Sequence, residues 1–349
     1  MADEPLLSVE DLHVSFATEE GVVQAVGGVS FTVERGEVLA IVGESGSGKS
    51  VSVMSLMGLT RGHNARFQGK AMFNGMDLIS APDGELRKVR GKDIAMVFQD
   101  PMSSLDPVYR VGDQIAEQIR VHNKDVSKPQ ALDRSVELME RVGIPRARER
   151  LRSYPHEFSG GMRQRVMIAM ALSNSPKLLI ADEPTTALDV TIQAQILEEL
   201  RELRDQTNSG VILVTHDLGV VADIADRVVV MYAGRVVEQG TLDEIFYDPQ
   251  HPYTWGLLGS ITRVDQDRSE KLPAIPGLPP SLLAPPSGCR FRPRCPHSFD
   301  RCQEEPPLSG RVPDSADHLD RCWLEVSDKR NVRQLGDRIG LAVDEAVTP

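Results

Sequence analysis

The chain has 349 residues, more than one typical domain, which predicts a large core with an appendage. Its 39 basic and 51 acidic residues give a formal net charge of −12, so we expect no nucleic-acid partner and no bulk attraction to anionic lipid. The first residues lack a secretory signal, and no apolar run reaches roughly 20 residues. We therefore expect a cytosolic location, where four cysteines are thiols or metal ligands.

Short apolar runs alternate with longer helix-like stretches over about the first 250 residues. Four of these runs predict strands, at residues 38–42, 178–180, 211–214 and 228–231. Continuous β-branched runs suit strands covered on both faces, so they favour a mainly parallel α/β core. Residues 110–175 change to helical spacing, which indicates a helical insertion into that core.

A proline-rich stretch divides the chain. Six prolines lie between residues 273 and 286, a composition typical of a linker. We therefore expect a nucleotide-binding domain at 1–262, with its helical subdomain at about 100–175, and a C-terminal extension at 263–349. All four cysteines lie in that extension.

The sequence GESGSGKS, residues 43–50, follows an apolar strand and precedes a helix-compatible run. This is the context of a phosphate-binding loop, whose glycines turn backbone N–H groups inward while the next helix N-terminus adds positive potential. Lys49 is expected to reach the β- and γ-phosphates, and the Ser50 hydroxyl to bind Mg²⁺. The alternative, a surface turn rich in glycine and serine, is disfavoured by the flanking elements. Kinases, GTPases and many ATPases remain open.

Two further motifs narrow the class. The strand beginning at residue 178 ends in Asp182 and Glu183, which places both carboxylates at its carboxyl edge beside the phosphate-binding loop. Asp182 would orient the Mg²⁺ shell, and Glu183 would polarise the attacking water. The sequence SGG at residues 159–161 opens an apolar helix at 162–172, a second anion site. Two such sites in one chain suggest that one serves a neighbour's nucleotide.

These motifs, in this order, resemble those of ATP-binding-cassette (ABC) nucleotide-binding subunits over about the first 260 residues. Gln99 in VFQDP is similar to the family's Q-loop, and ALD at residues 187–189 to its D-loop. His216 in VTHD resembles the switch histidine, whereas a lone histidine there would favour a satisfied strand-end residue. Phe16 lies where the family has an adenine-stacking aromatic, but it could equally belong to the core of an antiparallel N-terminal sheet.

The resemblance implies an α/β fold: a P-loop NTPase core with an N-terminal antiparallel β-subdomain and a helical subdomain. It also implies that two such domains pack head to tail, each signature closing over the partner's ATP. The signature FSGGM departs from LSGGQ at Phe158 and Met162 but keeps its serine and glycines. The residues implied for this chain's own ATP are Phe16, Gly43, Ser45, Gly46, Ser47, Gly48, Lys49, Ser50 and Val51. Those implied for the partner's ATP are Ser159, Gly160, Gly161 and Met162, with Asp189 of the D-loop. The resemblance implies that Mg²⁺ is bound by Ser50, Gln99 and Asp182. It implies that the catalytic residues are Glu183, His216 and Gln99.

Three stretches are similar to the ATPases of oligopeptide/dipeptide importers and of their nickel-importing relatives: FQDPMSSLDP at 98–107, FSGGMRQR at 158–165, and HPYT at 251–254. This resemblance implies a D-type subunit that pairs with a homologous F-type ATPase subunit. It further implies attachment to two transmembrane permease subunits at the cytoplasmic face of the membrane, with cargo delivered by an extracytoplasmic substrate-binding protein. The helical segment around 100–155 would provide the groove for the permeases.

The tail holds Cys289, Cys295, Cys302 and Cys322, separated by five, six and nineteen residues. Four cysteines within 34 residues favour a metal site over unligated thiols. Zn²⁺ usually takes close cysteine pairs, which this spacing lacks, whereas four thiolates with nearby arginines suit a [4Fe–4S] cluster. GCRFRPRCP is also similar to the tail of peptide-importer ATPases, some of which hold such a cluster. We therefore expect an iron–sulfur cluster of structural role, with Zn²⁺ as the alternative.

Three functions stay open at this stage. An importer ATPase accounts for every motif, although the cargo could be nickel, glutathione or a sugar instead of peptides. A soluble ABC ATPase for DNA repair or translation would carry coiled-coil insertions or two cassettes, and neither is visible. A metal-dependent redox module would rest on the tail alone and leave the ATPase motifs unexplained.

Overall fold

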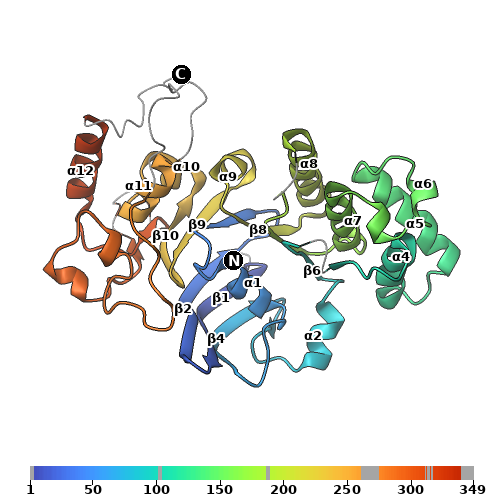
Figure 1. The fold of residues 1–349 in the computed structure, drawn as a ribbon, viewed down its shortest axis with the longest axis horizontal. Coiled ribbons are helices and arrows are strands. Elements are labelled where there is room, and N and C mark those ends of the chain that lie inside the picture. Colours follow the sequence, from blue (N-terminus) through green and yellow to red (C-terminus); the bar gives the residue numbers. More distant parts are fainter. Residues whose placement is uncertain are drawn as a thin grey trace.

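The computed structural model places a large sheet at the centre of the chain, with strand order β11-β12-β10-β9-β3-β8-β7-β6 (Figure 1). The structure describes residues 4–100, 104–185, 189–260, 275–310, 312, 315 and 317–338. From β9 to β6 the strands are parallel, and β10, β12 and β11 extend one edge in antiparallel pairs. The bounds are β3 (Val38–Val42), β6 (Ile94–Val97), β7 (Leu178–Asp182), β8 (Gly210–Thr215), β9 (Arg227–Tyr232), β10 (Arg235–Thr241), β11 (Ser309–Gly310) and β12 (Leu319–Asp320).

The predicted parallel α/β core is confirmed. The four predicted strands are β3, β7, β8 and β9, and every residue of β3, β7 and β8 is buried. Burial on both faces explains why their sequences are continuous apolar runs instead of alternating patterns.

The predicted N-terminal antiparallel sheet is also confirmed, with strand order β2-β1-β4-β5. Its strands are β1 (Leu7–Thr18), β2 (Gly21–Val33), β4 (Ala65–Phe73) and β5 (Met76–Asp77), and helices α1 (Lys49–Leu56) and α2 (Asp83–Val89) belong to the same part of the chain. Figure 1 shows this sheet below the central one, with α1 close to it.

Two apolar layers cover opposite faces of the central sheet. Leu39 and Ile41 of β3 pack in one core cluster with the N-terminal sheet and α1. Val38 of the same strand belongs to a second cluster, which contains the helices that follow β6 and β7. Because neighbouring strand residues point to opposite faces, α1 and those helices lie on different sides of the sheet.

The predicted helical insertion is confirmed for its described part, since residues 104–175 form helices and turns without a strand. It packs beside the β6 edge of the sheet (Figure 1). Residues 101–103 of the FQDPMSSLDP motif lie outside the described residues. The helices here are α4 (Val111–His122), α5 (Lys128–Arg141), α6 (Ala147–Arg150), the 3₁₀ turn η1 (Pro155–Glu157) and α7 (Gly160–Leu172); α8 (Val190–Thr207) and α9 (Leu218–Ile224) follow in the core.

The C-terminal extension adds strands to the central sheet. Residue Asp320 of β12 pairs with Glu238 of β10, and Ser309 of β11 pairs with Asp320. The expected boundary at residues 262 and 263, and Pro273 of the linker, lie outside the described residues. The remaining elements are α10 (Leu242–Tyr247), α11 (Pro252–Gly259), η2 (Arg292–Arg294), η3 (Asp300–Gln303) and α12 (Val326–Arg338). None of the helices in the described part of the chain has the length and apolar character needed to span a bilayer.

Candidate functional site

The phosphate-binding loop joins the end of β3 to the start of α1, as predicted. Gly43 and Gly48 have φ angles of 151° and 95°, and a Cβ on either would collide with a backbone carbonyl oxygen, of Met231 and of Ala25 respectively. The loop therefore needs glycine at both ends, because β2 and β9 approach its backbone closely.

Lys49 and Ser47 carry the polar groups of this loop. The Lys49 side chain is buried, and its Nζ donates hydrogen bonds to the Gly43 and Glu44 carbonyl oxygens at 2.7 and 3.0 Å. Burial lowers the pKa of Lys49, while the Glu183 and Asp182 carboxylates oppose that shift. The Ser47 hydroxyl is buried and has no partner among the described residues, so it fits an anionic ligand at the loop. Ser45 and Gly46 are exposed at its tip.

Ser50 and Asp182 bring two oxygen donors together. The Ser50 hydroxyl donates to a carboxylate oxygen of Asp182 at 3.0 Å, across the gap between α1 and the end of β7. Burial raises the pKa of Asp182, and the Ser50 hydrogen bond and the Lys49 charge oppose that shift. A hydroxyl and a carboxylate oxygen are ligands that Mg²⁺ prefers, so this donor set fits the ion.

Glu183 gathers side chains from three neighbouring strand ends. Its carboxylate accepts a hydrogen bond from Gln99 Nε2 at 2.9 Å, and His216 Nδ1 lies 3.2 Å from the other carboxylate oxygen. Gln99 follows β6, Glu183 follows β7 and His216 follows β8. The three predicted catalytic side chains therefore meet at one place. Glu183 also has a positive φ of 50°, unusual outside glycine, and its backbone N–H is fixed by the Val214 carbonyl at 2.8 Å.

The second predicted anion site begins α7. Ser159 caps this helix by accepting a hydrogen bond from the Met162 N–H at 3.3 Å. Ser159 and Gly160 are exposed, and a Cβ on Gly160 would meet no atom within 4 Å. Residues of α1 and α7 belong to different core clusters, so the two helices pack on opposite faces of the sheet.

Asp189 starts helix α8. Its carboxylate accepts a hydrogen bond from the Ile192 N–H at 3.0 Å, which makes it the N-cap of the helix. Ala187 and Leu188, the other residues of the expected D-loop, lie outside the described residues. The expected contact of Asp189 with a partner subunit stays a prediction.

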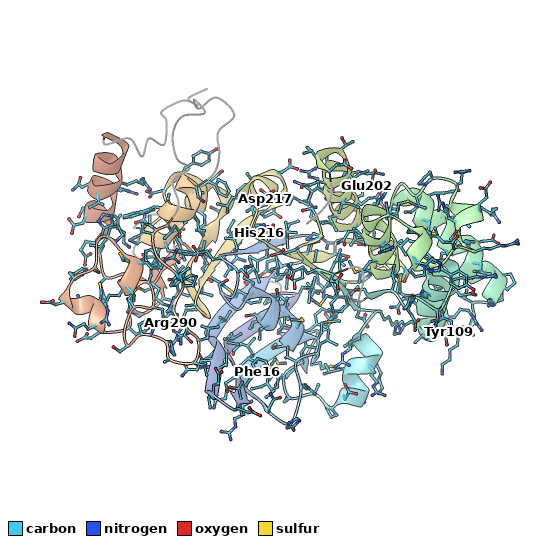
Figure 2. All side chains as sticks on the ribbon, viewed as in Figure 1. Phe16, Tyr109, Glu202, His216, Asp217 and Arg290 are labelled. Atoms are coloured by element: carbon cyan, nitrogen blue, oxygen red, sulfur yellow. The ribbon has the colours of Figure 1, made fainter. Side chains whose placement is uncertain are left out.

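Phe16 lies on β1, where it pairs with Val23 and Ala65 of the neighbouring strands. Figure 2 shows it on the N-terminal sheet, with His216 at the central sheet. Phe16 and Val51 are partly buried against the same core cluster, so both make structural contacts. Adenine stacking by Phe16 and nucleotide contact by Val51 stay predictions.

Comparison with known proteins gives the family. Residues 26–186 match the family model described as ABC transporter, and residues 237–302 match that of the oligopeptide/dipeptide transporter C-terminal region. The oligopeptide transport ATP-binding protein OppD of Salmonella typhimurium is 54% identical over 323 residues, covering 93% of this chain and 95% of OppD. The dipeptide transport ATP-binding protein DppD of Bacillus subtilis is 54% identical over 335 residues, covering 96% of this chain and 99% of DppD. The chain belongs to the ABC transporter ATP-binding proteins.

Solved structures agree on the ABC ATPase fold. The ATP-binding cassette MJ0796, described as a dimer in a post-hydrolysis state bound to ADP and Pi, superposes with a TM-score of 0.62 at 26% identity, covering 68% of this chain and 98% of that one. The protein cbiO1 from Clostridium perfringens superposes with a TM-score of 0.57 at 30% identity, covering 70% of this chain and 92% of cbiO1. This chain is thus an ABC cassette that also has residues outside the part matched by these two structures.

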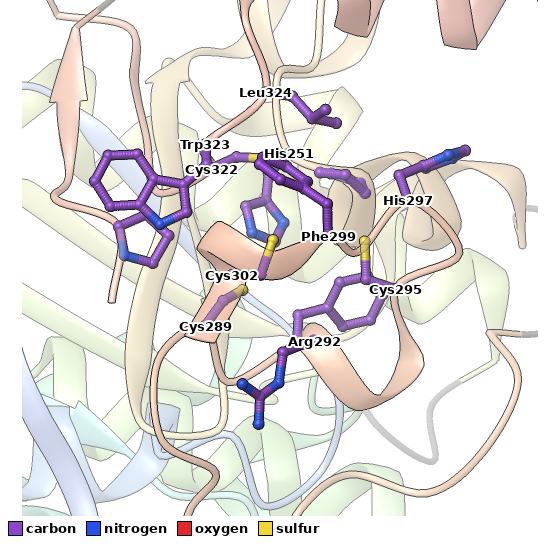
Figure 3. Close-up of a pocket in the computed structure, with 13 residues that line it drawn as sticks. His251, Cys289, Arg292, Cys295, His297, Phe299, Cys302, Cys322, Trp323 and Leu324 are labelled. Carbon is purple, nitrogen blue, oxygen red and sulfur yellow. The ribbon is translucent and has the colours of Figure 1, made fainter. Parts of the chain in front are cut away.

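The four cysteines of this ABC protein line one cavity, which His251 and Pro252 at the start of α11 also line (Figure 3). Cys302 and Cys322 are buried, and the other two are half-buried. Burial raises the pKa of Cys295 to about 11 and that of Cys322 to about 12, and it also raises that of Cys289. Within the described residues, however, no three His, Cys, Asp or Glu side chains are arranged to hold a metal ion. The structure thus brings the thiols to one cavity but gives the expected cluster no direct support.

The arginines near these cysteines have other partners than a cluster. Arg294 binds Glu44, Arg290 donates to the Ala233 carbonyl, and Arg301 stacks 3.8 Å from the centre of the Trp323 ring. Arg292 does line the cavity. The expectation that these arginines balance the charge of a cluster stays a prediction.

The HPYT motif is buried and connects the cassette to the extension and to the phosphate-binding loop. In the sequence, this motif indicated only a subfamily. The Glu238 carboxylate accepts from the His251 N–H at 2.9 Å and lies 2.9 Å from Nε2 of His318, a residue of the extension. Tyr253 is fully buried, and its hydroxyl accepts from the Glu44 N–H of the phosphate-binding loop at 2.9 Å. Nothing in the spacing of these residues signals the contacts, because the partners lie up to 209 positions apart.

Proposed function

We propose that this chain is the ATP-hydrolysing subunit of a membrane ABC importer that takes up oligopeptides or dipeptides. One observation carries the ATPase activity: Gln99, Glu183 and His216 converge within hydrogen-bond distance at the strand ends. The peptide cargo is supported by the names of the relatives, which are oligopeptide and dipeptide transport ATP-binding proteins.

Within the proposed site, Lys49 and the backbone N–H groups of residues 43–50 bind the ATP phosphates. Ser45, Gly46 and Ser47 line the loop, Gly43 and Gly48 allow its close turns, and Phe16 and Val51 contact the nucleotide. Ser50, Asp182 and Gln99 would hold Mg²⁺, which supplies charge neutralisation at the phosphates when bound.

Glu183 orients the water that attacks the γ-phosphate, since its carboxylate is held on both oxygens by Gln99 and His216. His216 contacts the γ-phosphate from the end of β8. Phosphoryl transfer requires mainly positioning and charge stabilisation, so these two side chains together with Lys49 account for the chemistry within this chain.

The signature residues Ser159, Gly160, Gly161 and Met162, with Asp189, serve the ATP of a second cassette. The exposed start of α7, on the sheet face opposite α1, supports this arrangement. The partner is a homologous F-type ATPase subunit, so the working unit is a heterodimer. It binds two transmembrane permease subunits through the helical subdomain, at the cytoplasmic face of the membrane, and an extracytoplasmic substrate-binding protein delivers the peptide.

The assembled complex tests this proposal. Affinity purification of the tagged full chain from membranes, followed by intact mass spectrometry, is expected to recover two permeases and a second ATPase. Peptide-loaded binding protein should then stimulate ATP hydrolysis by the complex in vesicles. Stimulation only by nickel, glutathione or a sugar would replace the peptide cargo, and recovery with ribosomes or nucleic acid would contradict an importer.

We also propose that Cys289, Cys295, Cys302 and Cys322 hold a structural [4Fe–4S] cluster, with Zn²⁺ as the alternative. Their gathering around one cavity, and the soft thiolate donor set, support a metal site. Anaerobically purified protein is expected to absorb near ~400 nm and to contain iron. A Cys302→Ser variant should lose both signals, and zinc without iron in the wild type would contradict the cluster.

A further inference from the structure

Glu44, the second residue of the phosphate-binding loop, is held at each of its polar groups. Its N–H donates to the Tyr253 hydroxyl at 2.9 Å, and its carbonyl accepts from Lys49 Nζ at 3.0 Å. Its carboxylate accepts two hydrogen bonds from Arg294, at 2.6 and 3.0 Å. The loop backbone is thus fixed at its first turn by residues from outside the loop as well as by its own lysine.

Arg294 belongs to the C-terminal extension, 250 positions further along the chain. Its side chain is 5% exposed, and every guanidinium nitrogen is engaged. Besides Glu44, it donates to the carbonyl oxygens of Pro276 and Ile275 at 2.9 and 3.0 Å, and to the Tyr232 hydroxyl at 3.3 Å. The bidentate bond to Glu44 raises the pKa of Arg294 further above its ordinary value.

Aromatic packing makes this contact rigid. The guanidinium carbon lies 5.7 Å from the centre of the Tyr232 ring, and the Tyr232 and Tyr253 rings are 4.6 Å apart. Phe291, three residues before Arg294, packs edge-on against both tyrosines. An arginine held by five hydrogen bonds in an aromatic setting has one available geometry, so it positions whatever it binds.

The contact also changes the charge of the loop. Glu44 lies between Gly43 and Ser45, so an unpaired carboxylate there would repel the phosphates that the loop binds. Pairing with Arg294 neutralises that charge and holds the side chain away from rotamers that would enter the loop.

We propose that Arg294 is a positioning residue for ATP binding, which acts on the phosphate-binding loop through Glu44. The C-terminal extension thereby sets the nucleotide affinity of the cassette. This inference rests on the proposed ATP site at residues 43–50.

The test measures ATP affinity of the full-length chain by calorimetry, in a Glu183→Gln background that prevents turnover. Arg294→Met is expected to weaken ATP binding by about tenfold or more, because it leaves the partly buried Glu44 carboxylate without its cation beside the phosphates. Arg294→Lys keeps the charge but not the bidentate geometry, so its ATP affinity should lie between those of the parent chain and Arg294→Met. In the assembled importer without the Glu183 substitution, Arg294→Met should raise KM for ATP more than it lowers kcat.

A double-mutant cycle shows whether Arg294 acts through Glu44. Glu44→Gln alone should bind ATP within about threefold of the parent chain, because its amide keeps a bond to Arg294. In the Glu44→Gln background, Arg294→Met should reduce the ATP affinity much less than it does in the parent chain, since no carboxylate is left to neutralise. An equal loss in both backgrounds would overturn the proposal.

Arg330→Met is the matched control. Arg330 of α12 also ties the extension to the cassette, through a 2.7 Å ion pair with Asp248, but at the end of α10. Its loss should leave ATP affinity unchanged. Equal weakening of ATP binding by Arg330→Met, or unchanged ATP affinity in Arg294→Met, would contradict the role of Arg294 but not the proposed ATP site. Failure of the parent chain to bind ATP would contradict the proposed site itself.

Discussion

The side-chain amide of Gln99 donates a hydrogen bond to the Glu183 carboxylate at 2.9 Å, which joins the second residue after β6 to the first residue after β7. Glu183 sits with a positive φ of 50°, a conformation that surrounding contacts must hold. Contacts within the chain therefore fix the direction of the carboxylate, as a water-orienting group requires.

Glu183→Gln should reduce ATP hydrolysis by at least about 100-fold while ATP still binds, because the amide keeps the shape but loses the charge that polarises water. Phosphate release by the assembled importer and ATP binding by calorimetry measure the two effects. Glu202→Gln, which changes an exposed carboxylate of α8 that pairs with Arg141, is the control and should hydrolyse ATP normally. Full hydrolysis in Glu183→Gln would remove this residue from the proposed mechanism.

His216→Ala tests the second contact of Glu183. The imidazole is 61% exposed, so its removal should leave the thermal unfolding temperature nearly unchanged. Hydrolysis should fall by about 10- to 100-fold, because the carboxylate loses its contact with His216 and the γ-phosphate loses one contact. A hydrolysis rate equal to that of the wild type would remove His216 from the proposed mechanism.

The buried ion pair of the extension predicts a large effect on stability. Lys329 Nζ lies 2.7 Å from an Asp320 carboxylate oxygen, and both side chains are 1% exposed. Lys329→Met should lower the free energy of unfolding by about 3–5 kcal/mol, since it leaves the carboxylate charge buried without its cation. Denaturant unfolding measures the loss.

Two variants control that prediction. Lys329→Met with Asp320→Asn should recover much of the stability, because no buried charge remains. Lys177→Met breaks an ion pair of similar length, 2.9 Å to Asp93, whose lysine is 53% exposed, and it should cost less than about 1 kcal/mol. Equal losses from Lys177→Met and Lys329→Met would show that burial is not the cause.

Strands β3, β7, β8 and β9 could be predicted because each is a continuous apolar run, and α7 because Ser159 and two glycines precede an apolar helix. Strands β11 and β12 could not, since each has two residues and no periodicity that reveals a partner. The bond between Arg294 and Glu44 was equally hidden. Pairing of this kind depends on the tertiary path of the chain, which the local pattern around either residue does not record.

His251 is expected to make the stability of the cassette depend on pH. Its side chain is buried at the start of α11, where Nδ1 accepts a hydrogen bond from the Tyr253 N–H at 3.1 Å. Burial lowers the pKa of His251 to about 3, assisted by the positive charges of Lys329 and Arg321. An unfolded histidine has a pKa of roughly 6.5, so between these values the unfolded chain binds more protons than the folded one.

Stability should therefore be fully present above pH ~6.5 and fall as the pH drops toward 3, by about 2 kcal/mol from this residue between pH 7 and 5. His251→Gln is expected to flatten the pH dependence of unfolding free energy over that window, whatever its absolute stability. The bond to Glu238 raises the pKa of His318 against the effect of burial, so His318 changes the unfolding free energy with the opposite sign. This contribution is the same in the wild type and in His251→Gln. His156→Gln, which removes an exposed imidazole, should keep the wild-type slope. An unchanged slope in His251→Gln would mean that this histidine is not held neutral in the folded chain.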